Sequence, residues 1–188
     1  MKFCSACGAA VELRTPIDDN RARHICTACN TIHYQNPRMV IGSIPVWEDK
    51  VLLCRRAIEP QYGKWTLPGG FMENGESTAQ AAIRETLEEA CARIEIINLY
   101  SMYSLPHIDQ VHLLFRAELL DLDFGPGQES LEVKLFSEAE IPWDELAFRP
   151  VRYSLEHYFA ERCSGTFSLH TGELSPVRHD VPVRATAL

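Results

Sequence analysis

The sequence predicts a layered α/β domain preceded by a small cysteine-rich module. Four of the seven cysteines fall within the first 29 residues, and from residue 37 β-rich segments alternate with two helical ones. The 188 residues are 46% hydrophobic and 23% charged, which is typical of a globular protein and excludes a disordered or fibrous chain. No apolar run approaches the ~20 residues that a membrane-spanning helix needs.

The module of residues 1–36 carries its cysteines as two C-x2-C pairs, Cys4/Cys7 and Cys26/Cys29, separated by eighteen residues. A segment of ~30 residues buries too little apolar surface to fold unaided, so a crosslink or a metal must stabilise it. Four thiolates on two tight turns can surround one tetrahedral zinc ion, which is then structural because no coordination position stays open. The alternatives are two disulfides, which need an oxidising compartment, or a redox pair, which needs a βαβ setting.

Residues 37–165 are expected to form the larger domain, and the polar, proline-dotted residues 166–188 a C-terminal tail with one strand around Thr166–His170. Strands mixed with two well-separated helices predict an α+β or layered α/β/α arrangement. The predicted strands are Met39–Trp47, Lys50–Cys54, Arg93–Leu105, Val111–Leu120 and Leu131–Phe136, the first two forming a hairpin around Glu48-Asp49. The predicted helices are Ser77–Ala92 and Pro150–Arg162.

The net charge of −8 opposes broad attraction to nucleic acid or to anionic lipid. Residues 1–36 carry four basic and three acidic side chains, which is too balanced for a phosphate-binding patch. The first five residues turn polar before any secretory apolar core develops, so we expect no signal peptide and a cytoplasmic protein.

The segment that carries the chemistry runs from Gly69 to Ala92. Turn formers open it as a loop, and Ser77 followed by Gln80 is a capping box that marks the start of a helix. Apolar side chains then recur at helical spacing and are expected to be the buried stripe. They are Ala79, Ala82, Ile83, Leu87 and Ala90.

Acidic side chains crowd the other side of this helix. Glu85, Glu88 and Glu89 lie at i, i+3 and i+4, where like charges repel. Together with Glu73 and Glu76 they give the loop and helix five acids against one arginine, which is −4 of the total −8. A hard divalent cation, Mg²⁺ above all, would neutralise such a cluster. The alternative is a solvated helix face in which Arg84 pairs with Glu88 and Glu89 with Arg93.

One string in this segment resembles the Nudix box, G-x5-E-x7-R-E-U-x-E-E-x-G-U with U aliphatic. It reads Gly70-x5-Glu76-x7-Arg84-Glu85-Thr86-Leu87-Glu88-Glu89-Ala90-Cys91-Ala92, and every charged position matches. Thr86 stands where an aliphatic residue is usual, and Cys91 replaces the closing glycine. Because cysteine enters a left-handed helix cap less easily than glycine, we expect the helix to end differently.

The resemblance implies a Nudix-type α/β/α sandwich with a mixed sheet, and metal-dependent hydrolysis of a nucleoside diphosphate linked to another group. It implies a Mg²⁺ or Mn²⁺ ion whose main ligands are Glu85 and Glu89. Glu88 would be an additional ligand, and the Gly70 carbonyl would complete the coordination shell. Glu76 would hold Arg84, which in turn positions the carboxylate of Glu85. The general base stays open among three glutamates. They are Glu89, Glu129 and Glu132.

A zinc ribbon ahead of such a domain also resembles the NADH pyrophosphatase group, but the S-Q-P-W-P-F-P type motif of that group is missing. Pro106, downstream of the box, is similar to the ADP-ribose pyrophosphatase subgroup. The wider chain, over nearly all of residues 1–160, resembles zinc-ribbon Nudix hydrolases of the ADP-ribose/FAD pyrophosphatase type. The similar stretches are Tyr34–Val40, Leu53–Arg56, Tyr62–Pro68 and Pro126–Glu132. The implied reaction releases AMP from ADP-ribose or FAD; NADH or a nucleoside triphosphate is the alternative substrate.

Further residues are candidates for contact with the substrate. Arg38, Arg55, Arg56 and Glu132 are expected to meet its phosphate or ribose groups. Trp65 and Tyr103 would stack on a flat ring or, as we favour, pack in the core, and Trp143 is expected to pack as well. His107 and His112 have no partner spacing and are expected to be structural or surface residues.

Two further expectations concern partners. The resemblance favours a homodimer that acts on a small nucleotide, with the ribbon forming part of the interface. A different class of function is a binding module, in which the ribbon recognises nucleic acid or protein while the larger domain senses a nucleotide. The intact charges of the box favour the enzyme.

Overall fold

The computed structural model describes residues 1–176. The chain forms two compact units, one of residues Met1–Asn36 and one that begins at Pro37. Within the described residues, no helix is long and apolar enough to cross a membrane.

The first unit is a small antiparallel sheet in the order β1-β2-β3. Its strands are β1 (Val11–Arg14), β2 (Arg23–Cys26) and β3 (Ile32–His33). Few of its side chains are buried, chiefly Cys4, Ile25, Cys26 and His33. The apolar core is therefore very small, as expected for a unit that depends on a crosslink or a metal.

The second unit is built on an eight-stranded mixed sheet in the order β10-β5-β4-β9-β8-β11, with β6 paired to β5 and β7 to β4. Its strands are β4 (Arg38–Trp47), β5 (Lys50–Arg56), β6 (Trp65–Thr66), β7 (Gly69–Phe71), β8 (Ile94–Leu105), β9 (Gln110–Leu119), β10 (Ser130–Phe136) and β11 (His170–Glu173). Its helices are α1 (Thr78–Ala90) and α2 (Arg149–Arg162), with short 3-10 turns at Pro106–Ile108, Glu138–Glu140 and Trp143–Glu145. The β4–β9 and β8–β11 pairs are parallel and the other pairs are antiparallel.

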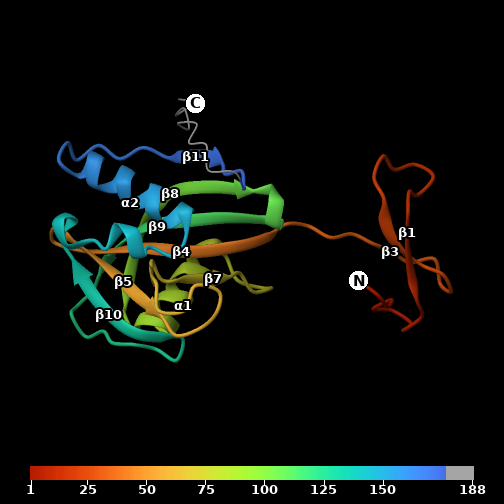
Figure 1. Cartoon of the computed structure of the whole chain (residues 1–188), viewed down its shortest axis with the longest axis horizontal. Coiled ribbons are helices and arrows are strands. Elements are labelled where there is room, and N and C mark those ends of the chain that lie inside the picture. Colours follow the sequence, from red (N-terminus) through yellow and green to blue (C-terminus); the bar gives the residue numbers. More distant parts are fainter. Residues whose placement is uncertain (177–188) are drawn as a thin grey trace. The chain divides into compact units, whose positions relative to one another are not determined.

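The two helices cover opposite faces of this sheet (Figure 1). Side chains of neighbouring residues in a strand point to opposite faces. Leu113 of β9 packs in a cluster with Ala81 and Ala82 of α1, whereas Leu114 packs with Leu155 of α2. The fold is therefore the α/β/α sandwich expected from the sequence, and the predicted hairpin, strands and helices match within a few residues.

The last described strand differs from the expectation. The strand expected around Thr166–His170 lies three to four residues later, as β11 at His170–Glu173, and it extends the central sheet by parallel pairing with β8. His170 anchors it, with Nε2 3.0 Å from Glu161 Oε1 and its ring stacked 3.8 Å from that of His157. Both partners lie on α2, so the anchor depends on tertiary contacts that strand periodicity does not reveal. Residues 177–188 of the expected tail lie outside the described residues.

The buried face of α1 also differs from the expected apolar stripe. Ala82 and Ala90 are buried as expected, but Ile83 and Leu87 are 41% and 51% exposed. Residues Glu85, Thr86 and Glu89 are buried in their place, together with Ala81. The helix is rotated about its axis relative to the prediction, because its acidic side chains Glu85 and Glu89 face the preceding loop. Apolar periodicity alone wrongly assigns Ile83 and Leu87 to the core.

Thr86, which stands where the Nudix box usually has an aliphatic residue, forms a buried polar pair. Its hydroxyl donates to the Ala82 carbonyl at 2.7 Å and lies 2.6 Å from the hydroxyl of Ser43 on β4. Both side chains are 0% exposed. Ser43 thus supplies the hydrogen bond that makes a threonine tolerable on this face.

We expect Thr86→Val to lower the free energy of unfolding by about 1–3 kcal/mol, because it leaves the buried Ser43 hydroxyl without its partner. The double variant Ser43→Ala/Thr86→Val should recover much of that loss, since both hydroxyls are then removed. Urea unfolding of the wild type, both single variants and the double variant measures the coupling. Strictly additive losses would contradict the pairing.

The C-terminal end of α1 also differs from the expectation. Cys91 adopts the left-handed conformation, with φ 49° and ψ 22°, and its N–H donates to the Leu87 carbonyl. The helix therefore ends as it would with glycine at this position, although a side chain makes that conformation less favourable. The tertiary contacts of the helix end, rather than the intrinsic preference of cysteine, decide this cap.

Candidate functional site

The site begins where β7 leads into α1. The capping box is confirmed, with Gln80 N donating to Ser77 Oγ at 3.2 Å and Ser77 N donating to Gln80 Oε1 at 2.8 Å. Pairing of β7 with β4 fixes the two glycines that precede the loop. A Cβ on Gly70 would lie 2.6 Å from both carboxylate oxygens of Glu85, so the main chain approaches this carboxylate as only glycine allows.

Two carboxylates of the box are turned into the protein. Glu85 and Glu89 are 8% and 6% exposed, and Gly69 N donates to Glu89 Oε2 at 3.1 Å. Burial raises the pKa of Glu89 to about 7, and burial also raises the pKa of Glu85. The side chain of Glu88, in contrast, is 58% exposed. The solvated-face alternative therefore describes Glu88 and is wrong for Glu85 and Glu89.

Arg84 connects the acids of the loop and the helix. Its guanidinium forms a two-point pair with Glu76 at 3.0 and 2.8 Å and contacts Glu85 at 2.8 Å and Glu88 at 3.0 Å. Hydrogen bonds from Arg84, followed by that from the Glu73 N–H, lower the pKa of Glu76 to about 2. Charge-assisted, planar contacts of this kind fix orientation as well as charge. Arg84 therefore holds the Glu85 carboxylate in place.

The Glu89–Arg93 ion pair of the solvated-face alternative is absent from the described residues. Arg93 pairs with Asp121, which follows the end of β9 by two residues. The Glu89 carboxylate instead accepts a hydrogen bond from Gly69 N. Arg93 therefore does not compensate for the free-energy cost of burying this carboxylate. The i,i+4 spacing allows such a pair to form but does not ensure it, because Glu89 and Arg93 each have another partner in the fold.

The remaining candidates divide into two groups. Glu129 and Arg56 lie near the box: Gly127 N, two residues before Glu129, donates to the Glu89 carbonyl at 3.0 Å, and Ala57 N, next to Arg56, donates to the Glu129 carbonyl at 2.8 Å. Arg56 is 8% exposed and its guanidinium lies 5.0 Å from the ring of Phe148. Glu132 is engaged elsewhere, 3.8 Å from Arg55, with both side chains about half exposed.

Arg38, at the start of β4, packs its guanidinium over the ring of Phe71 at 4.7 Å. The aromatic candidates belong to the core, as we favoured. Trp65 and Tyr103 are 8% and 1% exposed, and Trp143 packs against the cluster that includes Trp65. His112 is half-buried, and its burial lowers its pKa to about 4.

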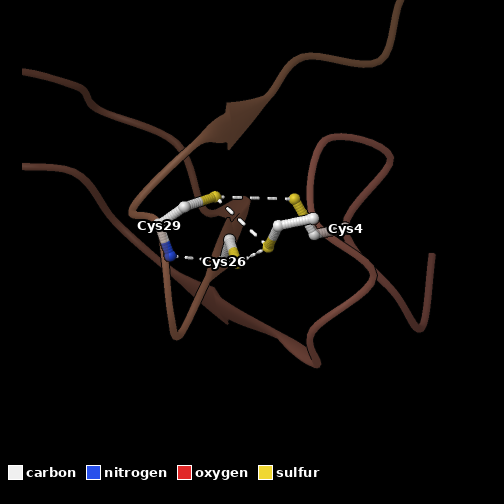
Figure 2. A group of neighbouring side chains, drawn as sticks. Cys4, Cys26 and Cys29 are labelled. Carbon is white, nitrogen blue, oxygen red and sulfur yellow. Dashed lines mark hydrogen bonds between the residues drawn. The ribbon is translucent and has the colours of Figure 1, made fainter.

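The first unit gathers its four cysteines into one cluster. The Sγ atoms of Cys4, Cys7, Cys26 and Cys29 all lie within 4.8 Å of one another. The Sγ–Sγ separations are 3.7 Å from Cys4 to Cys29 and 3.4 Å from Cys7 to Cys26. Four thiolates around zinc at ~2.3 Å would be about 3.8 Å apart. Figure 2 shows the labelled cysteines of the two C-x2-C pairs pointing toward one another.

Local hydrogen bonds favour the thiolate form of Cys26 and Cys29. Hydrogen bonding to Thr31, whose Oγ1 is 3.0 Å from Cys29 Sγ, lowers the pKa of Cys29 to about 6. The N–H groups of Ala28 and Cys29 lie 3.4 Å from Cys26 Sγ and lower its pKa. All seven cysteines, each within the described residues, are free. This donor set fits one structural zinc ion.

Sequence reasoning missed His33. Its Nε2 lies 3.3 Å from Cys4 Sγ, and the residue is buried at 9% exposure. A group bonded to a metal ligand orients that ligand and tunes its basicity. Because β3 is only two residues long, no periodicity or spacing in the sequence marks this histidine as a neighbour of the cluster.

Comparison with known proteins places the chain in a family. The family model described as Nudix N-terminal matches residues 2–35, and the model described as NUDIX domain matches residues 36–161. The chain therefore belongs to the Nudix hydrolase family and carries the zinc-ribbon module ahead of its catalytic domain. A NUDIX hydrolase from Nitrosomonas europaea has 60% identical residues, with 93% of this chain and 99% of that one covered at a TM-score of 0.91.

Two relatives carry names that state an activity. An ADP-ribose pyrophosphatase of Methanocaldococcus jannaschii is 29% identical over 61% of this chain and 69% of its own. A protein of Pseudomonas syringae named NAD-capped RNA hydrolase NudC is 30% identical over 86% of this chain. The chain spans only 56% of the length of that relative. The family implies a nucleotide substrate and a divalent metal; the particular substrate is a separate question.

Proposed function

We propose that the chain hydrolyses the pyrophosphate bond of a nucleoside diphosphate linked to another moiety, of the ADP-ribose or FAD kind, and releases AMP. One observation carries this proposal: two buried carboxylates, Glu85 and Glu89, lie against the Gly69–Gly70 main chain. Arg84 pairs with Glu85, yet burial still raises the pKa of both carboxylates, and a bound cation would favour their charged forms. The name of the Methanocaldococcus jannaschii relative supports ADP-ribose as a substrate.

The oxygen donors of the box suit a hard divalent cation, Mg²⁺ or Mn²⁺. Glu85 and Glu89 would be its main ligands, with Glu88 and the Gly70 carbonyl completing the set. When bound, the metal polarises the phosphate oxygens and makes a water more acidic. The chain's own residues then orient this set: Arg84 holds the Glu85 carboxylate, and Glu76 holds Arg84.

We assign the proton-accepting role to Glu129 among the three candidate bases. Glu89 is engaged by the Gly69 N–H and serves as a ligand, and Glu132 pairs with Arg55. Glu129 follows Gly127 by two residues, and Gly127 N donates to the Glu89 carbonyl at 3.0 Å, so the segment that carries Glu129 is held against the helix of the box. The water proton would pass to this carboxylate as the water oxygen attacks phosphorus and the anhydride P–O bond breaks.

Arg56 is the strongest candidate for a contact with the substrate phosphates. It is buried, and its Nε donates to the Pro60 carbonyl at 2.9 Å, which fixes the guanidinium plane. Arg38, Arg55 and Glu132 stay predictions for contacts with the ribose or the second half of the substrate.

The proposal is tested with a panel of nucleotides and Mg²⁺, containing ADP-ribose, FAD, NADH, a nucleoside triphosphate and NAD-capped RNA. We expect AMP with ribose 5-phosphate, or AMP with FMN, as the main products. Turnover confined to NADH, the capped RNA or the triphosphate would support the alternative substrates. No hydrolysis together with tight nucleic-acid binding in a gel shift would support the binding-module class.

We further propose that the protein is a cytoplasmic homodimer in which the ribbon contributes to the interface. The ribbon exposes several large apolar side chains, which are often covered in an assembly. They are Phe3, Leu13, Ile17 and Tyr34. Light scattering that gives the mass of one chain would remove the dimer from this proposal.

A further inference from the structure

The C-terminal end of α1 is held by a loop that is distant in the sequence. This loop, residues 120–129, connects β9 to β10. Gly125 N donates to the Ala90 carbonyl at 2.9 Å, and Gly127 N donates to the Glu89 carbonyl at 3.0 Å. The last carbonyls of a helix have no partners within the helix, so these bonds complete its end. The loop is thereby bonded to the main chain of the helix that carries the box.

Gly127 lies closer to the helix than any other residue type could. A Cβ at this position would be 1.7 Å from the Glu88 carbonyl oxygen and 2.8 Å from its carbon. Its φ is outside the left-handed region, so glycine is needed here for space and not for its backbone conformation. A Cβ on Gly125, two residues earlier, would meet no atom within 4 Å, so that position is free of the constraint.

The main chain is attached again two residues after Gly127. The carbonyl of Glu129 accepts a hydrogen bond from Ala57 N at 2.8 Å, directly after β5. Ser130 N donates to the Gly127 carbonyl at 3.2 Å and closes the turn between the two attachments. Glu129 therefore lies on a short segment that is bonded to α1 on one side and to the central sheet on the other.

We propose that Gly127 is a positioning residue, whose close packing on the last turn of α1 sets the place of the Glu129 carboxylate relative to Glu85 and Glu89. This inference rests on the proposed function, in which Glu129 accepts the proton of the attacking water. Gly127 itself touches no reacting atom. It acts by keeping the base and the metal-ligand helix in one rigid arrangement, and such an arrangement matters because a displacement of ~1 Å can cost about a hundredfold in rate.

A double-mutant cycle on kcat tests this role. Glu129→Gln should lower kcat by about 10²–10⁴-fold, because it removes the proton acceptor. Gly127→Ala should lower kcat by about a hundredfold with little change in KM, because the loop must move away from Glu88. The two losses should not add, since both act through the same carboxylate. Full additivity, or a Gly127→Ala variant with wild-type kcat, would overturn the proposal.

Gly125→Ala is the matched control, because it makes the same chemical change in the same loop where the structure has open space. It should keep the wild-type kcat and KM. A loss in Gly125→Ala equal to that in Gly127→Ala would show that any stiffening of the loop matters, and would also overturn the close-packing argument.

A measurement on the wild-type protein covers the case in which Gly127→Ala does not fold. Hydrogen exchange by NMR should find the Gly125 and Gly127 amides protected like the last turn of α1. Exchange at unprotected rates would overturn the proposal. This measurement needs no substrate, so it separates a failure of the loop attachment from a failure of the proposed function.

Discussion

Glu89→Gln should lower kcat on the best nucleotide of the panel by at least about a hundredfold while the fold stays intact. Even the outer partners of a metal ligand are worth 10–100-fold, and Glu89 is proposed as a ligand itself. The glutamine keeps the size of the side chain and can still accept from Gly69 N, so the loss would arise from the missing charge. Circular dichroism and steady-state kinetics at saturating Mg²⁺ measure the two effects.

The same variant separates metal binding from catalysis. A ligand that binds only the folded state raises Tm, so Mg²⁺ or Mn²⁺ should stabilise the wild type and fail to stabilise Glu89→Gln to the same degree. Glu95→Gln, an exposed acid on β8, is the control and should behave like the wild type in both assays. A Glu89→Gln enzyme with full turnover would refute this assignment of the metal site.

Removal of zinc should unfold the first unit. Structural zinc contributes apparent free energies of about 10–16 kcal/mol in small zinc modules, and this unit has too few buried apolar side chains to replace that contribution. Cys26→Ser removes a fully buried thiolate, so the variant should bind less than one zinc per chain. Its backbone amide signals from residues 1–36 should collapse to unfolded positions while those of the second unit persist.

Cys163→Ser is the control for that experiment, because Cys163 is exposed and lies outside the cysteine cluster. Zinc content by elemental analysis and two-dimensional NMR of the full chain give the readout. A first unit that keeps its dispersed signals after chelation of zinc, or that contains disulfides when isolated under reducing conditions, would contradict the zinc assignment.

The candidate site was predictable from the sequence to an unusual degree, because its acids lie within one loop and one helix. Glu76, at the end of the loop, and Glu85, on the helix, both contact Arg84, so the three charges come from one continuous loop–helix segment. The C-x2-C pairs were equally informative, since each pair lies on one tight turn. Local spacing succeeds wherever the interacting groups are close along the chain.

Long-range contacts were beyond such reasoning. No pattern marks the pairing of Thr86 with Ser43, or of His33 with Cys4, because the partners are separated by 43 and 29 residues. The choice among the candidate bases has the same origin. Glu129 and Glu132 are equally acidic in the sequence, and only the fold distinguishes them: the Glu132 carboxylate lies 3.8 Å from Arg55, while the main chain around Glu129 is bonded to α1 and to the residue after β5.

The amino-acid sequence by itself determined the family, the order of the main elements, the four zinc-type cysteines and the acidic set of the box. The tertiary structure alone decided which face of α1 is buried, how Cys91 ends that helix, and which loop joins its last turn. The physical reason is that periodicity reports only that a helix has two faces. Packing against the sheet and the Gly69–Gly70 main chain determines that Glu85 and Glu89 turn inward while Ile83 and Leu87 face outward.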